Sequence, residues 1–132
     1  MSIPNYKALN NIKQYAETSI TTGVEDATPH RLIQMLMEGV LTRIASAKLA
    51  VKQGRINKKG EDIGRALSII NGLRNCLDHE VGGDLAKNLD SLYEYMIYRL
   101  MEANLKSDLD ILTEVHGLIG EIKTSWDAIG TS

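Results

Sequence analysis

The chemistry open to this chain depends first on its three histidines, His30, His79 and His116. A helical bundle that holds two metal ions needs glutamates facing inward and Glu-x-x-His pairs that supply both ligands from one helix face. The residue three positions before each histidine is instead alanine, cysteine or threonine. We therefore expect no metal ion and no other cofactor.

Cys76 is the single cysteine of the chain and lies one helical turn before His79. At this spacing the two side chains could form a thiolate–imidazole nucleophile. Cys76 also lies beside Leu73 and Leu77 on the apolar side of the expected helix, which favours a buried and unreactive thiol. A single cysteine forms no internal disulfide, as is usual in the cytoplasm. We therefore predict that the chain is not an enzyme.

One basic cluster stands out, with no acidic residue inside it; its members are Lys48, Lys52, Arg55, Lys58 and Lys59. Nucleic-acid binding would also need interleaved aromatic side chains, and the whole chain carries fifteen basic and seventeen acidic residues. We therefore expect no nucleic-acid partner. The cations would instead stabilise the C-terminal end of the preceding helix.

The composition of 132 residues, 43% apolar and 24% charged, fits one soluble domain. No apolar run is long enough to cross a membrane, and the first residues lack the pattern of a signal peptide. We therefore predict a cytoplasmic protein without membrane insertion.

Apolar residues recur every three or four positions, and no alternating pattern typical of strands occurs. Thr28-Pro29 is the clearest helix start, because threonine accepts free amide hydrogens and proline suits the first helical position. Gly54 would end this helix, Asn57 and Asp84 would cap later ones, and Gly82-Gly83 would separate them. The predicted helices span 29–53, 58–80, 84–105 and 108–129, with Ser107 or Asp108 capping the last.

The short loops between these helices predict that consecutive helices run antiparallel. The expected fold is an all-α, up-down four-helix bundle over residues 28–130. Residues 1–27 have sparse apolar positions and form an expected N-terminal arm with one short helix. The arm would either hang free or pack its few apolar side chains on the bundle.

Five glycines fall inside the predicted helices and lower helix stability there; they are Gly39, Gly64, Gly72, Gly117 and Gly120. Close approach of neighbouring helices is the favoured explanation. The alternative is a shallow groove in which a partner helix contacts the backbone.

Several segments of the sequence, taken together, match the pattern of one protein family. Thr28-Pro29-His30-Arg31-Leu32-Ile33 opens the first long helix, and Leu92-Tyr93-Glu94-Tyr95-Met96 lies in the third. Glu102-Ala103-Asn104 follows, and Ile12-Lys13-Gln14-Tyr15 lies in the arm. Together they resemble the flagellar secretion chaperone family FliS over nearly the whole chain. The chain departs from the family pattern at Thr28, usually serine, and at Met37-Glu38, usually an aromatic residue and aspartate.

The resemblance implies a chaperone that binds the disordered C-terminal segment of flagellin and prevents premature polymerisation. It also implies delivery of flagellin to the flagellar type III export gate, whose protein would be a second partner. A homodimer of the chain without flagellin is left open. The physics agrees, because a disordered segment can bury the apolar faces of its helices in grooves of a bundle.

Under this hypothesis the expected flagellin groove lies on the second and third helices, where apolar residues exceed what a narrow bundle seam needs. We predict that it is lined by Ile70, Leu73, Leu77, Leu92, Tyr95 and Met96. Ile12 and Tyr15 of the arm would cover this groove when it is empty. The resemblance further implies that flagellin displaces them, so that they can contact the export gate.

Two other classes of function stay open at this point. A ligand-binding or catalytic bundle would have a deep pocket with converging polar groups of shifted pKa. A helical oligomerisation or adaptor module without a flagellin client would associate with itself through the same apolar residues.

Overall fold

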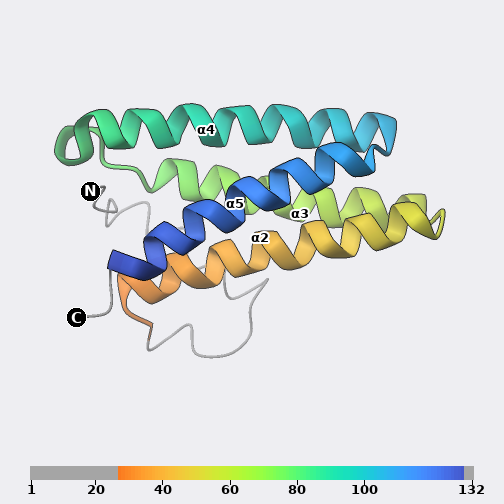
Figure 1. Ribbon diagram of the computed structural model, residues 1–132, viewed down its shortest axis with the longest axis horizontal. Helices are drawn as coiled ribbons and strands as arrows, with labels where there is room; N and C mark the ends of the chain where they lie inside the picture. The colour runs from red at the N-terminus through yellow and green to blue at the C-terminus, as the bar shows by residue number, and fades with distance from the viewer. Residues whose placement is uncertain (1–26, 130–132) are drawn as a thin grey trace.

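The computed structural model of the chain describes residues 27–129 as four α-helices (Figure 1). Their bounds are Pro29–Lys52 for α2, Ile56–Asn75 for α3, His79–Lys106 for α4 and Leu109–Ile129 for α5. No residue in this range forms a strand. The predicted all-α fold is confirmed, and the predicted arm lies, apart from Ala27, outside the described residues.

Consecutive helices run antiparallel, so the chain crosses the length of the bundle four times in alternating directions (Figure 1). α2 packs against α3 and α5, and α4 packs against the same two helices. Side chains from all four helices therefore meet in one core. Its largest fully buried side chains are Leu36, Met37, Ile44, Ile63, Ile69, Ile70, Leu73, Met96, Leu100, Leu112 and Ile119.

The predicted start of α2 is confirmed. Thr28 Oγ1 accepts a hydrogen bond from the backbone N–H of Arg31 at 3.0 Å, and Pro29 occupies the first helical position. α2 ends at Lys52, and Gly54 then adopts a φ of 70°. This left-handed glycine lets the Arg55 N–H turn back to the Ala50 carbonyl at 2.8 Å, as at many helix C-termini.

The predicted boundary between the second and third helices was wrong. α3 ends at Asn75 rather than near residue 80, and α4 begins at His79 rather than at Asp84. Asp78 caps α4, because its Oδ1 accepts hydrogen bonds from the N–H groups of Glu80 and Val81, both at 3.1 Å. The predicted break at Gly82-Gly83 is present as a kink inside α4 rather than as a boundary between helices, because Gly83 has non-helical angles of φ 53° and ψ −128°.

The cap predicted at Asn57 was also wrong, because α3 begins at Ile56 after Arg55 without a side-chain capping bond. The cap predicted for the last helix is confirmed at Asp108, whose Oδ1 accepts from the N–H groups of Asp110 and Ile111 at 2.9 and 3.2 Å. These bonds satisfy amides of the first turn of α5 that have no partner within the helix.

Two members of the basic cluster have structural partners. Lys59 is buried, and its Nζ donates to the Asn104 carbonyl and the Ser107 hydroxyl, both at 2.8 Å. This contact ties the start of α3 to the end of α4. Lys58 lies 3.3 Å from the fully buried carboxylate of Asp62.

Three of the glycines predicted to permit close helix approach do not do so. A Cβ atom added at Gly64, Gly117 or Gly120 would meet no atom within 4 Å. The close-packing explanation was therefore wrong at these positions, because open space surrounds the glycine there.

Candidate functional site

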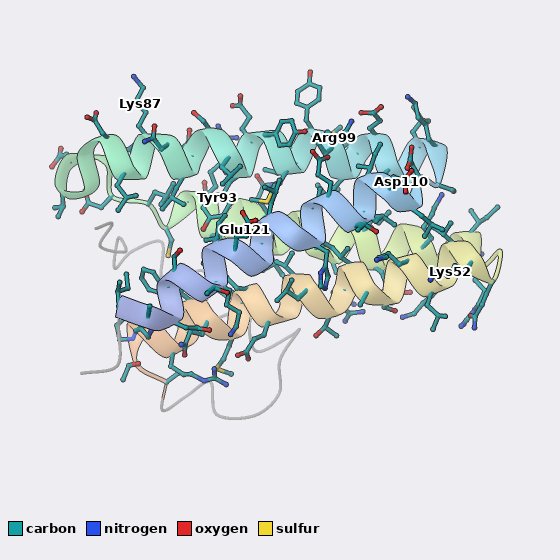
Figure 2. All side chains as sticks on the ribbon, in the orientation of Figure 1. Lys52, Lys87, Tyr93, Arg99, Asp110 and Glu121 are labelled. Atoms are coloured by element: carbon teal, nitrogen blue, oxygen red, sulfur yellow. The ribbon has the colours of Figure 1, made fainter. Side chains whose placement is uncertain are left out.

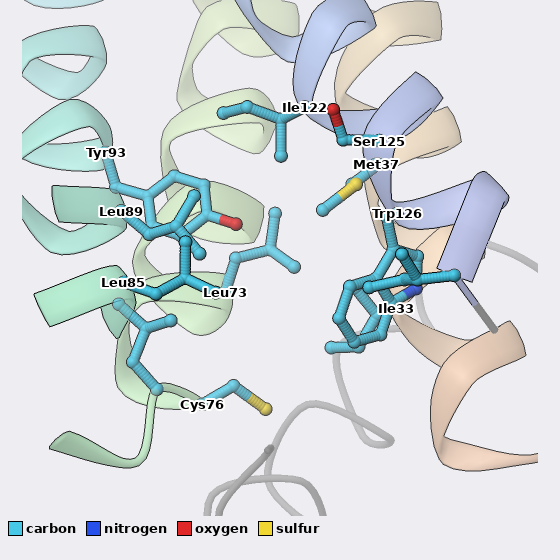
Figure 3. Close-up of a pocket in the computed structure, with 12 residues that line it drawn as sticks. Ile33, Met37, Leu73, Cys76, Leu85, Leu89, Tyr93, Ile122, Ser125 and Trp126 are labelled. Atoms are coloured by element: carbon cyan, nitrogen blue, oxygen red, sulfur yellow. The ribbon is translucent and has the colours of Figure 1, made fainter. Parts of the chain in front are cut away.

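An apolar pocket of about 440 Å³ opens at one end of the bundle (Figure 3). All four helices contribute to it: the beginning of α2, the end of α3, the first half of α4 and the end of α5. We call it the apolar pocket; its lining residues are Ile33, Met37, Leu73, Cys76, Leu77, Leu85, Leu89, Tyr93, Ile122, Ser125, Trp126 and Ile129.

The arrangement of α4 and α5 explains why the pocket lies at this end. The turn around Ser107 and Asp108 joins these helices at the opposite end, and they diverge from there toward the pocket (Figure 1). Leu85, Leu89 and Tyr93 follow one another at four-residue spacing, which places them on one face of α4. Diverging helices cannot close their apolar faces against each other, so part of these faces lines a pocket.

The pocket has a buried floor and an exposed rim. Met37 and Leu73 are 2% exposed and Cys76 is 3% exposed. Leu85 on α4 and Ile129 on α5 are 43% and 49% exposed. Apolar side chains of this size left in water at the mouth of an apolar pocket are typical of a binding site.

The wall formed by α5 is held in place by α2. The indole Nε1 of Trp126 donates to the His30 carbonyl at 3.0 Å, and the two rings stack at 4.7 Å between centroids. One residue further, Asp127 accepts from the side-chain amide of Gln34 at 2.7 Å. These contacts fix Trp126 at the edge of the pocket.

The polar atoms of the pocket are neutral. Burial raises the pKa of the Cys76 thiol to about 12, and burial also raises the pKa of the Tyr93 phenol. Both groups stay protonated at neutral pH, and the lining includes no Asp, Glu, Lys, Arg or His. The pocket therefore suits uncharged, apolar side chains, and the alternative of a thiolate at Cys76 is not supported.

Residues 27–129 contain neither a cluster of metal-binding side chains nor a membrane-spanning helix. No three His, Cys, Asp or Glu side chains in this range come together as a metal site. None of the four described helices has an apolar stretch long enough to cross a membrane.

Comparison with known proteins decides the family. The sequence model described as "Flagellar protein FliS" matches residues 10–132. The chain belongs to the FliS family. It is 53% identical to the flagellar secretion chaperone FliSB of Pseudomonas aeruginosa, a match that covers 92% of this chain and 97% of the relative.

More distant relatives carry the same description. The flagellar secretion chaperone FliS of Salmonella typhimurium is 44% identical over 91% of this chain and 90% of its own length. The one from Bacillus subtilis is 32% identical over 89% and 84%, respectively. The predicted resemblance is confirmed, and this FliS family member belongs among flagellar secretion chaperones.

The structure divides the six residues of the predicted groove among different environments. Leu73 and Leu77 line the apolar pocket, whereas Ile70 and Met96 are completely buried in the core. Leu92 packs against the core and is partly buried. Tyr95, the sixth, is 43% exposed on α4. The two predicted arm residues, Ile12 and Tyr15, lie outside the described residues.

Tyr95 belongs to a polar surface contact between α4 and α5. Its hydroxyl donates to Glu114 Oε2 at 2.7 Å, and Arg99 Nε donates to Glu114 Oε1 at 2.8 Å. These hydrogen bonds keep the pKa of the Glu114 carboxyl below its usual value. Tyr95 therefore lies on an exposed face, away from the residues that line the pocket.

Sequence reasoning did not assign several pocket residues to a site. Leu85, Leu89, Ile122 and Trp126 continue the apolar faces of their helices, so their spacing alone does not distinguish them from core residues. Leu85 and Trp126 do lie near the ends of these faces, where a diverging neighbour leaves side chains uncovered. Their position near a helix end was the one sequence feature that could have indicated that these side chains are left uncovered.

Proposed function

We propose that this FliS family member binds the C-terminal segment of flagellin, keeps flagellin from polymerising and delivers it to the flagellar export gate. The observation that carries the proposal is the uncharged apolar pocket with exposed leucine and isoleucine at its rim. Membership in a family of flagellar secretion chaperones supports a flagellar protein as the client, meaning the protein segment that the chaperone binds.

The pocket fits a segment that becomes helical when it binds. Its walls come from helix faces, and a cavity of about 440 Å³ accommodates a few apolar side chains at once. An amphipathic helix presents such side chains at three- and four-residue spacing. A disordered client segment would lose chain entropy on binding and gain the burial of its apolar face.

We propose that the bound segment begins at Leu73 and Leu77 in the pocket and continues onto the neighbouring surface of α3 and α4. Of the other predicted groove residues, Leu92 is partly buried and lies next to this surface. Tyr95 is exposed on the α5 side of α4, where it bonds to Glu114, so the segment would reach it only by also crossing α4. Ile70 and Met96 would support this surface from beneath, because both are fully buried.

For the arm, we propose that Ile12 and Tyr15 cover the pocket when no client is bound. Both are of the residue types that an apolar pocket accepts. Client binding would displace them and leave them free to contact the export gate protein. This part of the proposal depends on the family resemblance of the Ile12-Lys13-Gln14-Tyr15 segment.

A calorimetric titration with the C-terminal segment of flagellin from the same organism tests the proposal. We expect near-stoichiometric binding and added helical circular dichroism, and no binding of the N-terminal flagellin segment. Leu85→Ser should weaken binding because Leu85 forms the rim of the pocket. Leu49→Ser is the matched control, since Leu49 is 55% exposed and does not line the pocket. Absence of binding at high micromolar concentration would refute the proposal.

A second candidate function is self-association as an oligomerisation or adaptor module. It is favoured by three exposed apolar residues on one face of α4, which are Tyr98 at 75%, Met101 at 58% and Leu105 at 85%. Such a face could form a homodimer of the client-free chain. Sedimentation velocity distinguishes the two functions, because a dimer that persists and binds no flagellin segment would favour self-association.

A further inference from the structure

The hydroxyl of Tyr93 is the feature of the pocket that its apolar character does not explain. Tyr93 is 3% exposed, and its side chain points inward from α4, whereas Lys87 on the same helix points to solvent (Figure 2). The close-up shows the hydroxyl oxygen reaching into the pocket beside Leu73 (Figure 3). Phenylalanine would fill the same space without placing a polar atom there.

None of the residues from 27 to 129 forms a hydrogen bond with this hydroxyl, although it lies within an apolar lining. The other polar atoms that line the pocket differ from it. The Trp126 indole already donates to the His30 carbonyl, Ser125 is exposed, and the Cys76 thiol is only a weak donor.

A ligand that fills the pocket would separate this hydroxyl from solvent. Burial raises the pKa of Tyr93, so the phenol remains an O–H donor when the pocket is filled. A ligand made only of hydrocarbon would leave the donor without a partner, which is unfavourable in an apolar environment. A ligand that brings an oxygen acceptor would restore the hydrogen bond.

We propose that Tyr93 determines specificity in this pocket by requiring an uncharged oxygen acceptor within the apolar stretch of the bound segment. A carbonyl at a helix end, or the side chain of Asn, Gln, Ser or Thr, has the required chemistry. A carboxylate is disfavoured, because the lining has no cation to pair with it. This inference rests on the proposed binding of the flagellin segment.

The test is Tyr93→Phe in the full chain, titrated with the C-terminal segment of flagellin. We expect affinity to fall by about 5- to 10-fold, the usual effect of one lost hydrogen bond. The melting temperature of the free variant should be unchanged or higher, because the substitution removes a polar atom without removing a bond within the described residues. Tyr98→Phe is the matched control and should leave affinity unchanged, since Tyr98 is 75% exposed.

Two results would overturn the inference while the proposed function stands. One is that Tyr93→Phe binds the segment as tightly as the unmodified chain or more tightly. The other is that the free variant loses stability in parallel with affinity, which would show that the hydroxyl has a structural partner within the chain. Failure of the unmodified chain to bind would refute the proposed function and this inference together.

Discussion

Trp126 and His30 join the last helix of the bundle to the first. They are 96 positions apart in sequence, yet the Trp126 indole Nε1 donates to the His30 carbonyl at 3.0 Å and the rings stack with an interplanar angle of 15°. Because Trp126 also lines the apolar pocket, the same contact closes the bundle and shapes the proposed site.

Trp126→Phe should destabilise the chain by about 1 to 2 kcal/mol, because it removes the indole donor and leaves the His30 carbonyl without this bond. Urea unfolding followed by circular dichroism measures the change. His30→Ala separates the two contributions, since it removes the ring stack and keeps the backbone carbonyl. If Trp126→Phe and the unmodified chain unfold at the same urea concentration, the hydrogen bond does not stabilise the bundle.

Asp62 should make stability depend on acid pH. Although burial opposes its ionisation, hydrogen bonds from Ser46 at 2.6 Å and Arg43 at 3.1 Å, together with Lys58, lower its pKa. A carboxyl with a lowered pKa in the folded state stabilises the fold above its unfolded value of about 4. This contribution is lost as the pH falls through the lower folded value.

The measurement is the free energy of unfolding of the chain and of Asp62→Asn between pH 7 and pH 2. At pH 7 we expect Asp62→Asn to be less stable by about 2 kcal/mol, which is below the roughly 3 to 5 kcal/mol lost when a fully buried ion pair is broken. The smaller loss applies because the Arg43 and Lys58 side chains are 25% and 35% exposed and regain water. The difference should shrink below about pH 4, and a difference constant over this range would contradict the assignment.

The fold could be predicted because its signals are local. Thr28-Pro29 and Asp108 supply caps at the positions expected from sequence, and the spacing of apolar residues shows which helix faces turn inward. The boundary at Asp78 could not be found in this way, because the apolar pattern continues through Leu77 and suggests an unbroken helix. Gly83 was the stronger local signal, and it produces a kink inside α4 instead.

The pocket could be predicted only in part, because it depends on how far two helices diverge. Ile70 and Leu73 lie one helical turn apart on the same apolar face, yet only Leu73 lines the pocket. Tyr93 and Tyr95 are two positions apart, and one is buried while the other bonds to Glu114 at the surface. Spacing places such residues on a helix face, and the neighbouring helix decides which of them is covered.

Gly117→Ala and Gly64→Ala should each stabilise the chain by about 0.5 to 1 kcal/mol. Both glycines lie inside helices, an added Cβ meets no atom within 4 Å, and alanine has the higher helix propensity. Thermal unfolding measures the gain. Gly83→Ala is the control and should lower the stability of the chain, because the φ of 53° and ψ of −128° at this position are strained for alanine.

The same two variants test the alternative role predicted for these glycines. If Gly117→Ala is more stable but binds the flagellin segment less tightly, the open backbone at this position contacts the client. If a variant has the same stability and the same affinity as the unmodified chain, neither helix propensity nor client contact explains the glycine at that position.

Cys76 can report whether the pocket is occupied. It is the single cysteine of the chain, so a thiol reagent labels this site alone and no cysteine has to be introduced. The thiol is buried in the pocket and burial raises its pKa to about 12, so the thiol stays protonated at pH 8. Reaction with Ellman's reagent should therefore be slow in the folded chain and fast in urea. Adding the C-terminal segment of flagellin should slow it further, because the bound segment covers Cys76. The N-terminal segment should have no effect, and an equal rate with both segments would place the client away from this pocket.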